Sequence, residues 1–309
     1  MGKRLAQALA GALSALAFAG CGDTQSSAPT ASSSETNTVS APAPTQIVAL
    51  TKEGDVVLID RDTNESRVLA SFPPRDDPQV EAGSFRAVDV MALPDGRLLL
   101  ATCCEPAAGH MYVLSEDGHR LKDEDLFAED AGHDAGTRVA SGELVGVVIR
   151  PLSDLNSAAY TLALPPDLTG YSPDNITWAP GGDRIAFTLG GRLAVVDVSA
   201  NSLADATYLD PPDGSHWSGA AYTADGTVAV EQGGDPLHPS GPSRVLRVDM
   251  ATGESSELVP TQGRVTDLAV DSTGTCLLWV EGGNLRWLVD DEDATLPGDF
   301  IAAGWMSTA

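Results

Sequence analysis

The strongest constraint on the fold is a hairpin pattern that recurs along the chain at intervals of 40 to 48 residues. Each copy consists of a short apolar run, a turn that contains glycine and a second apolar run. The turn glycines are Gly96, Gly142, Gly182, Gly226 and Gly274, and the copy at Gly142 is the weakest. Repeats of about 40 to 50 residues that contain short strands are typical of four-stranded propeller blades. The period therefore predicts an all-β propeller.

The second half of each unit also recurs. Segments 53–60, 191–197 and 283–290 each place a turn before an apolar run that ends in Asp. In the hairpins that follow two such runs, Asn64 and Gly253 occupy the same position of the repeat. Both residue types tolerate the positive φ that tight hairpin turns require. The repeat is therefore expected in the backbone conformation as well as in the residue types.

The number of units indicates how the ring closes. Residues 46–70 supply three strands and lack an innermost one, whereas segment 300–305 has the character of an innermost strand. Pairing this C-terminal strand with the first blade gives six four-stranded blades and leaves no open sheet edge between them. Seven blades remain an alternative if region 120–175 holds another unit. Residues 46–309 are expected to form this single propeller domain.

One stretch resembles a known family. The segment from Trp178 to Phe187, followed by Leu193 to Asp197, is similar to the repeat of TolB-like and WD40-like propellers. The resemblance extends loosely over residues 46–309, is close only near 176–209 and is degenerate near 137–165. It implies the propeller fold and assigns no catalytic residue.

The N-terminus carries targeting features. Lys3 and Arg4 precede an apolar stretch at 5–19, which is too short for a comfortable membrane-spanning helix. The small residues before Cys21 resemble the lipobox of bacterial lipoproteins, although Phe18 stands where leucine is usual. This predicts a signal peptide at 1–20, a diacylated Cys21 and a protein anchored to the outer side of the cell membrane. An ordinary signal peptide with a chance cysteine is the alternative.

Residues 21–45 read as a lipidated cysteine followed by a disordered linker rich in Ser, Thr, Ala and Pro. Such a composition buries too little apolar area to offset the entropy of ordering. No later run of 18 apolar residues follows it. The formal net charge of −26 disfavours nucleic acid and anionic lipid headgroups and favours cationic partners.

The loops suggest a binding face. In a propeller, the connections between blades share one face with the turns between the second and third strands. Loops positioned on a rigid scaffold are where function concentrates. The candidate residues on this face are His110, His133, His216, His238, Asp76 and Asp77. Imidazole and carboxylate suit Zn²⁺ or Ca²⁺, but no ligand-spacing motif supports a metal site, and no cofactor is predicted.

Three cysteines follow Cys21. Cys103 and Cys104 can form a vicinal disulfide in an oxidising compartment, or remain reduced with side chains on opposite faces of the sheet. Cys276 lies two blades away, beyond the reach of a disulfide, and is expected to be a buried free thiol.

Three functional readings follow. The first is a non-enzymatic scaffold that binds an envelope protein or a small molecule, because no common catalytic motif is present. The second is a metal-dependent hydrolase or lactonase that uses carboxylates with His216 or His238. The third is a quinoprotein, which segment 248–253 weakly resembles, although Glu257 stands where its tryptophan belongs.

Overall fold

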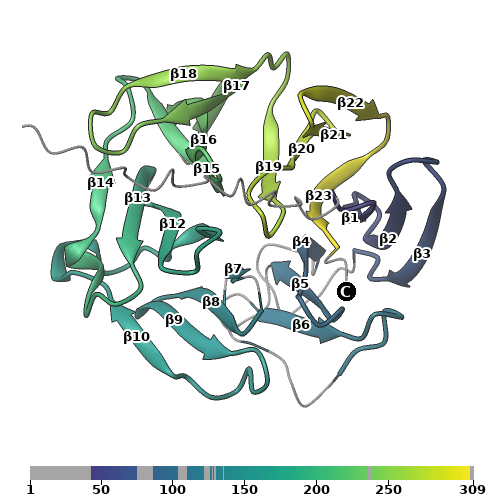
Figure 1. Cartoon of the computed structure of the whole chain (residues 1–309), viewed down its shortest axis with the longest axis horizontal. Coiled ribbons are helices and arrows are strands. Elements are labelled where there is room, and N and C mark those ends of the chain that lie inside the picture. The colour runs from purple at the N-terminus through teal and green to yellow at the C-terminus, as the bar shows by residue number, and fades with distance from the viewer. Residues whose placement is uncertain are drawn as a thin grey trace, which may run out of the picture. The chain divides into compact units, whose positions relative to one another are not determined.

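The computed structural model describes residues 43–74, 86–103, 110–121, 126, 128, 130–134, 136–235 and 238–306. Residues 41–309 form one compact unit. Six antiparallel sheets stand around a central axis like the blades of a propeller (Figure 1). The all-β, six-bladed prediction is therefore confirmed. No helix in the described ranges is long and apolar enough to span a bilayer.

Blade 1 closes the ring as predicted. Its sheet runs in the order β23 (Phe300–Trp305), β1 (Gln46–Thr51), β2 (Asp55–Asp60) and β3 (Ser66–Ser71). The register pairs Ile47 with Trp305 and Leu50 with Ala302. The two ends of the domain are thereby joined by backbone hydrogen bonds, and Trp305 Nε1 donates to the Cys276 carbonyl of the preceding blade at 3.1 Å.

Blades 2 and 3 are less regular. Blade 2 contains β4 (Arg86–Ala92), β5 (Leu98–Cys103) and β6 (His110–Leu114). Met111 on β6 and Leu126 exchange backbone hydrogen bonds of 2.8 and 2.9 Å, so Leu126 lies at the position of a fourth strand. Blade 3 contains β7 (Asp130–His133), β8 (Arg138–Glu143), β9 (Gly146–Pro151) and β10 (Tyr160–Ala163).

In blade 3, the first turn lies at a different position from the one predicted. Gly142 was predicted to mark the turn between the first and second strands, but it lies inside β8. That turn is instead formed by residues 134–137 and contains Gly136. The hairpin beside Gly142 joins β8 to β9, so the predicted pattern was displaced by one strand.

Blades 4 to 6 are complete four-stranded sheets. Blade 4 contains β11 (Asp174–Trp178), β12 (Arg184–Leu189), β13 (Arg192–Asp197) and β14 (Thr207–Leu209). Blade 5 contains β15 (Ser215–Thr223), β16 (Gly226–Asp235), β17 (His238–Val248) and β18 (Ser255–Val259). Blade 6 contains β19 (Val265–Val270), β20 (Leu277–Glu281), β21 (Asn284–Val289) and β22 (Glu292–Leu296). The short 3₁₀ turn η1 (Pro166–Leu168) precedes blade 4, and η2 (Leu203–Asp205) lies between β13 and β14.

The core consists of six apolar clusters, and each lies between two neighbouring blades. The second strands therefore carry continuous apolar runs, such as Leu98 to Ala101, because both faces of each sheet are covered. Burial on two faces favours uninterrupted runs over simple alternation. Adjacent blades hold each other in place through these clusters.

The ring has two faces that differ in the loops they carry. The connection face carries the inter-blade loops and the turns between second and third strands, including 144–145, 164–173, 190–191 and 210–214. The turn face carries the turns between first and second strands, including 93–97, 134–137 and 179–183. The described chain begins at the turn face, where Arg61 N donates to the Thr45 carbonyl at 2.8 Å.

Candidate functional site

The innermost strands enclose a channel along the propeller axis. Its cavity has a volume of about 300 Å³ and is lined chiefly by β4, β7, β11, β19 and β23. Five aspartates line it: Asp89, Asp130, Asp174 and Asp267 lie on these strands, and Asp271 directly follows β19. No lysine or arginine is among the described residues that line it. The channel is thus a confined acidic space.

Two of these carboxylates join neighbouring blades. Asp130 on β7 accepts hydrogen bonds from Ala131 N at 2.7 Å and from Ile176 N of blade 4 at 3.0 Å. Asp267 on β19 accepts from Leu268 N at 2.8 Å and from Ala303 N of β23 at 2.6 Å. Each side chain therefore satisfies a backbone donor of the next innermost strand along the ring.

The channel environment favours the neutral form of these acids. Burial raises the pKa of Asp267 to about 8, with a further contribution from the charge of Asp89. Burial, followed by the charges of Asp89 and Asp174, raises the pKa of Asp130 well above its usual value. Burial also raises the pKa of Asp89. Burial and the negative charge of neighbouring acids therefore favour the neutral form of Asp130 and Asp267, and burial favours that of Asp89.

The channel acids were absent from the sequence-based candidates, although the repeat contains a signal for them. Asp89 and Asp267 each stand seven residues before a turn glycine, at Gly96 and Gly274. Gly219 holds that position in blade 5. Aligning the repeat sequences therefore identifies this position, but only the three-dimensional structure shows that the carboxyls come together.

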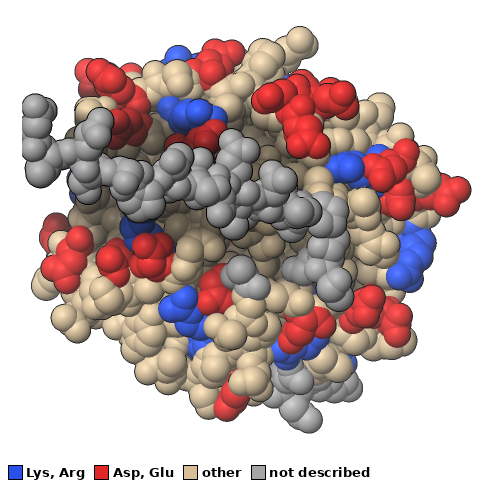
Figure 2. All heavy atoms as spheres, viewed as in Figure 1, with Lys and Arg blue, Asp and Glu red and all other residues tan. Residues whose placement is uncertain are grey.

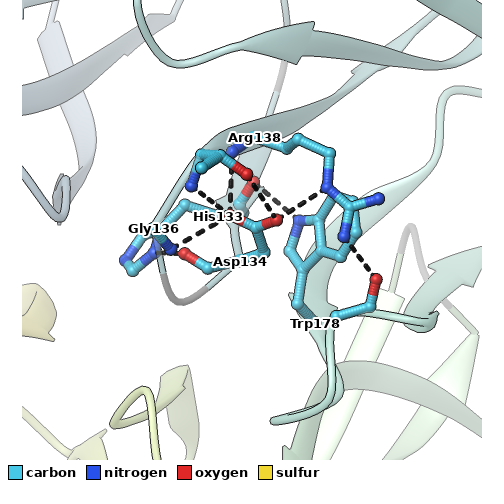
Figure 3. Close-up of polar contacts among 8 residues, drawn as sticks. His133, Asp134, Gly136, Arg138 and Trp178 are labelled. Carbon is cyan, nitrogen blue, oxygen red and sulfur yellow. Dashed lines mark hydrogen bonds and ion pairs between the residues drawn. The ribbon is translucent and has the colours of Figure 1, made fainter.

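His133 lies on the turn face and not on the predicted connection face. The prediction treated His133 as part of a loop between two blades. Residues 130–133 instead form the innermost strand β7, so His133, the last residue of that strand, lies at the opposite end of the channel. The ring Nδ1 lies 2.8 Å from the Asp134 carbonyl oxygen (Figure 3). Burial lowers the pKa of His133.

Asp134, next to His133, organises the β7–β8 turn and its contact with blade 4. Its carboxylate accepts from the backbone N–H groups of Gly136, Thr137 and Arg138 and pairs with Arg138 Nε at 2.6 Å (Figure 3). The Arg138 guanidinium lies 4.6 Å from the centre of the Trp178 ring. Burial opposes the negative charge, but these hydrogen bonds keep the pKa of Asp134 below its usual value. This cluster is structural.

On the connection face, the structure brings two of the predicted histidines to the same group of loops. His216 Nδ1 lies 3.0 Å from the Gly234 carbonyl, and His238 Nδ1 lies 3.2 Å from Asp235 Oδ1. A cavity of about 430 Å³ is lined by His216, Gly234 and Asp235 together with Gly190 and Pro211. His216 is buried and His238 is exposed.

The remaining predicted positions are dispersed. His110 begins β6 in blade 2, and its ring centre lies 4.9 Å from that of Tyr112. Asp76 and Asp77 lie outside the described residues. Within the described ranges, no group of three or more His, Cys, Asp or Glu side chains has the spacing of a metal site. Zn²⁺ or Ca²⁺ binding therefore stays untested.

The cysteine predictions have separate outcomes. Cys276 is a buried free thiol, as predicted. Cys103 takes part in a disulfide, but Cys104 lies outside the described residues, so the vicinal pairing stays a prediction.

Comparisons with known proteins support the fold alone. No family model matches the chain, and no curated protein matches it. Among solved structures, TolB from Acinetobacter baumannii is 16% identical with a TM-score of 0.57, over 84% of this chain and 65% of TolB. The chain thus spans less than two thirds of that TolB. A putative TolB from Agrobacterium tumefaciens is 15% identical with a TM-score of 0.53, over 82% of this chain and 89% of that one.

A chain in a nidogen/laminin complex is 12% identical with a TM-score of 0.60, over 85% of this chain and 99% of that one. At these identities the shared property is architecture, and fold does not by itself assign function. The chain therefore has a β-propeller fold of the TolB-like and WD40-like type, built from six blades.

Proposed function

We propose that this chain is a lipid-anchored, extracytoplasmic binding module whose propeller presents its connection face to a protein or small-molecule partner. The observation that carries the proposal is the exit point of the N-terminal segment. Thr45 is hydrogen-bonded to Arg61 in the β2–β3 turn, and Ala43 packs against the cluster between blades 6 and 1. The described chain therefore begins at the turn face, and the connection face lies on the opposite side of the ring.

The chemistry of the N-terminus supports the anchor. A diacylated cysteine supplies two acyl chains, which is enough for stable membrane attachment. The sequence that follows Cys21 is rich in Ser, Thr, Ala and Pro, a composition typical of spacers, and a random coil of that length spans roughly 25 Å. A rigid ring on such a spacer is suited to binding, because its loops are pre-positioned and little order has to be gained on association.

The fold and the charge also agree with a scaffold. TolB-like propellers share this architecture, and the rim of the ring carries many acidic groups (Figure 2). Such a surface attracts cationic groups and repels nucleic acid. Stoichiometric divalent metal in the purified protein would instead favour the hydrolase alternative.

Metabolic labelling with palmitate in a bacterial host that exports the chain tests the anchor. The parent protein is expected to be labelled and to sediment with membranes, whereas Cys21→Ser is expected to lose the label and to be released. Phe18→Leu, which restores the usual lipobox residue, serves as the matched control and is expected to be labelled at least as well. Equal labelling of Cys21→Ser and the parent protein would rule out the anchor.

A further inference from the structure

The turn between β8 and β9 carries two exposed aliphatic side chains at the connection face. Leu144 and Val145 are each 58% exposed. In blades 4 and 6 the same position of the blade holds Gly190-Gly191 and Gly282-Gly283, all with positive φ. Two-residue hairpin turns usually contain Gly, Asn or Asp, because these residues suit the backbone and remain in water. An exposed Leu-Val pair is therefore unusual here.

Folding does not explain this pair. Neither Leu144 nor Val145 adopts positive φ, and the following Gly146, with φ of 132°, takes the unusual conformation. Both side chains face solvent, so they add little to the buried core. The turn thus exposes apolar surface at a position where blades 4 and 6 carry paired glycines.

The exposed pair is part of a larger apolar strip, which we define as Leu144, Val145, Leu164, Leu168 and Tyr171. Leu164 N donates to the Val145 carbonyl at 3.1 Å, and Tyr171 N donates to the Leu168 carbonyl at 3.3 Å. Leu164 and Leu168 are partly buried against the cluster between blades 3 and 4 and connect the two exposed ends of the strip. Tyr171 is 52% exposed and its ring packs beside Gly190 of blade 4. The strip therefore extends from blade 3 to blade 4 across the connection face.

Of the charged side chains near the apolar strip, Arg150 and Arg192 each pair with an acid, whereas Asp167 is exposed. Asp167 in η1 is exposed between Leu164 and Leu168. The nearby cation Arg150 is only 12% exposed at its side chain and pairs with Glu143 at 2.6 Å. Apolar side chains with an acidic border match a partner surface of opposite charge, and they are poorly suited to an anionic membrane.

We propose that the apolar strip docks a protein partner whose contact surface consists of apolar side chains flanked by Lys or Arg. The proposal deepens the binding role proposed above and names the surface and the chemistry of its partner. Exposed aliphatic and aromatic side chains act as anchors that are desolvated on binding. The acidic border adds attraction and orientation, and this part is expected to weaken with salt.

A defined probe tests this chemistry without knowledge of the natural partner. The probe is an amphipathic helical peptide of about 14 residues built from Leu and Lys, and two reference peptides replace Leu by Ser or Lys by Glu. Binding to the full chain carrying Cys21→Ser is measured by fluorescence anisotropy at low and high salt. The Leu/Lys peptide is expected to bind best, and both reference peptides are expected to bind more weakly.

The decisive variant is Leu144→Gly with Val145→Gly, which installs the Gly-Gly turn that blades 4 and 6 already use. It is expected to weaken binding of the Leu/Lys peptide by about tenfold, or about 1.4 kcal/mol. Val68→Ser on β3 is the matched control, because Val68 is equally exposed at 59% but lies in blade 1. It is expected to bind like the parent chain.

Three outcomes would overturn the proposal. The first is equal binding of the peptide to the parent chain and to the Gly-Gly variant with unchanged circular dichroism. The second is loss of a concentration-dependent dimer in the Gly-Gly variant, which would identify a second copy as the occupant. The third is strip-dependent binding to vesicles of anionic lipid. None depends on lipidation, so failure of the anchor and failure of the docking surface are distinguishable.

Discussion

At the residue scale, the channel aspartates show how position changes chemistry. The same side chain has a lowered pKa in the exposed turn at Asp60, where the backbone and hydroxyl of Thr63 donate to it, and a raised pKa at Asp267. The difference arises because Asp267 is buried beside other acids and faces no cation. Such carboxyls bind protons more tightly in the folded state than in the unfolded chain.

The higher proton affinity of Asp267 in the folded state makes the free energy of unfolding decrease as pH rises. For Asp267 the folded pKa of about 8 exceeds the unfolded value near 4, so its contribution is complete below about pH 4 and is lost as pH rises to about 8. The free energy of unfolding from urea titrations is therefore expected to decrease from pH 5 to pH 8. The slope is about 1.4 kcal/mol per pH unit for each such proton.

Asp267→Asn is expected to reduce that slope, because the amide does not titrate. Asp213→Asn, at an exposed carboxyl in the β14–β15 connection, is the control and is expected to keep the parent slope. Asp267→Asn also removes one acceptor for Leu268 N or Ala303 N, which changes the absolute stability. The test is therefore the pH slope of the free energy of unfolding. An unchanged slope would contradict proton retention by Asp267.

A second prediction concerns Gly142 on β8. A Cβ at this position would lie 1.9 Å from the Pro173 carbonyl oxygen of the loop before β11, whereas one at Gly136 meets nothing within 4 Å. Gly142→Ala is therefore expected to cost about 1–3 kcal/mol or more through overpacking. Gly136→Ala, in the same blade, is expected to be nearly neutral. Equal melting temperatures for both variants would refute this close approach.

At the element scale, the closing strand β23 is the decisive feature. It pairs with β1 and also packs against the apolar cluster between blades 6 and 1. Its sequence, with Ala302, Ala303 and Gly304, is weakly β-forming on its own. Its strand conformation therefore depends on the edge of β1, which supplies the hydrogen-bond partners.

Removal of β23 tests closure. A chain that ends at Gly298 exposes the edge of β1 and is expected to melt at a much lower temperature or to associate, because open strand edges promote pairing between molecules. A chain that ends at Met306 retains the strand and is the control. Monomeric, thermally unchanged protein after the longer truncation would contradict the closed ring.

Blade 3 shows why some elements were misassigned. The hairpin with Leu144 and Val145 has the apolar flanks of a first turn, whereas the true first turn at 134–137 follows the four-residue strand β7. A four-residue strand that contains Gly132 has almost no periodic signal. Consequently His133 was expected on the wrong face.

At the scale of the whole molecule, stability is distributed around the ring. Each of the six apolar clusters joins two blades, so no blade is complete without its neighbours. The N-terminal residues 1–40 fall outside this unit. The ring and the tether are therefore expected to be independent in stability.

Deletion of residues 1–40 tests this independence. Calorimetry is expected to show one unfolding transition at the same temperature as in the Cys21→Ser chain, because all six clusters remain. A lower transition temperature or a second transition after the deletion would show that the N-terminal segment stabilises a blade.

The sequence by itself determined the all-β class, favoured six units over seven and predicted the pairing of the last strand with the first, because turn glycines and apolar runs are local and repeat along the chain. It also placed His216 and His238 on the connection face. Only the tertiary structure decided where the acids of four separate blades meet, which end of the channel His133 occupies, and that the exposed Leu144-Val145 turn adjoins Tyr171. These depend on the approach of segments distant in sequence, and no local pattern encodes the burial and mutual repulsion that follow.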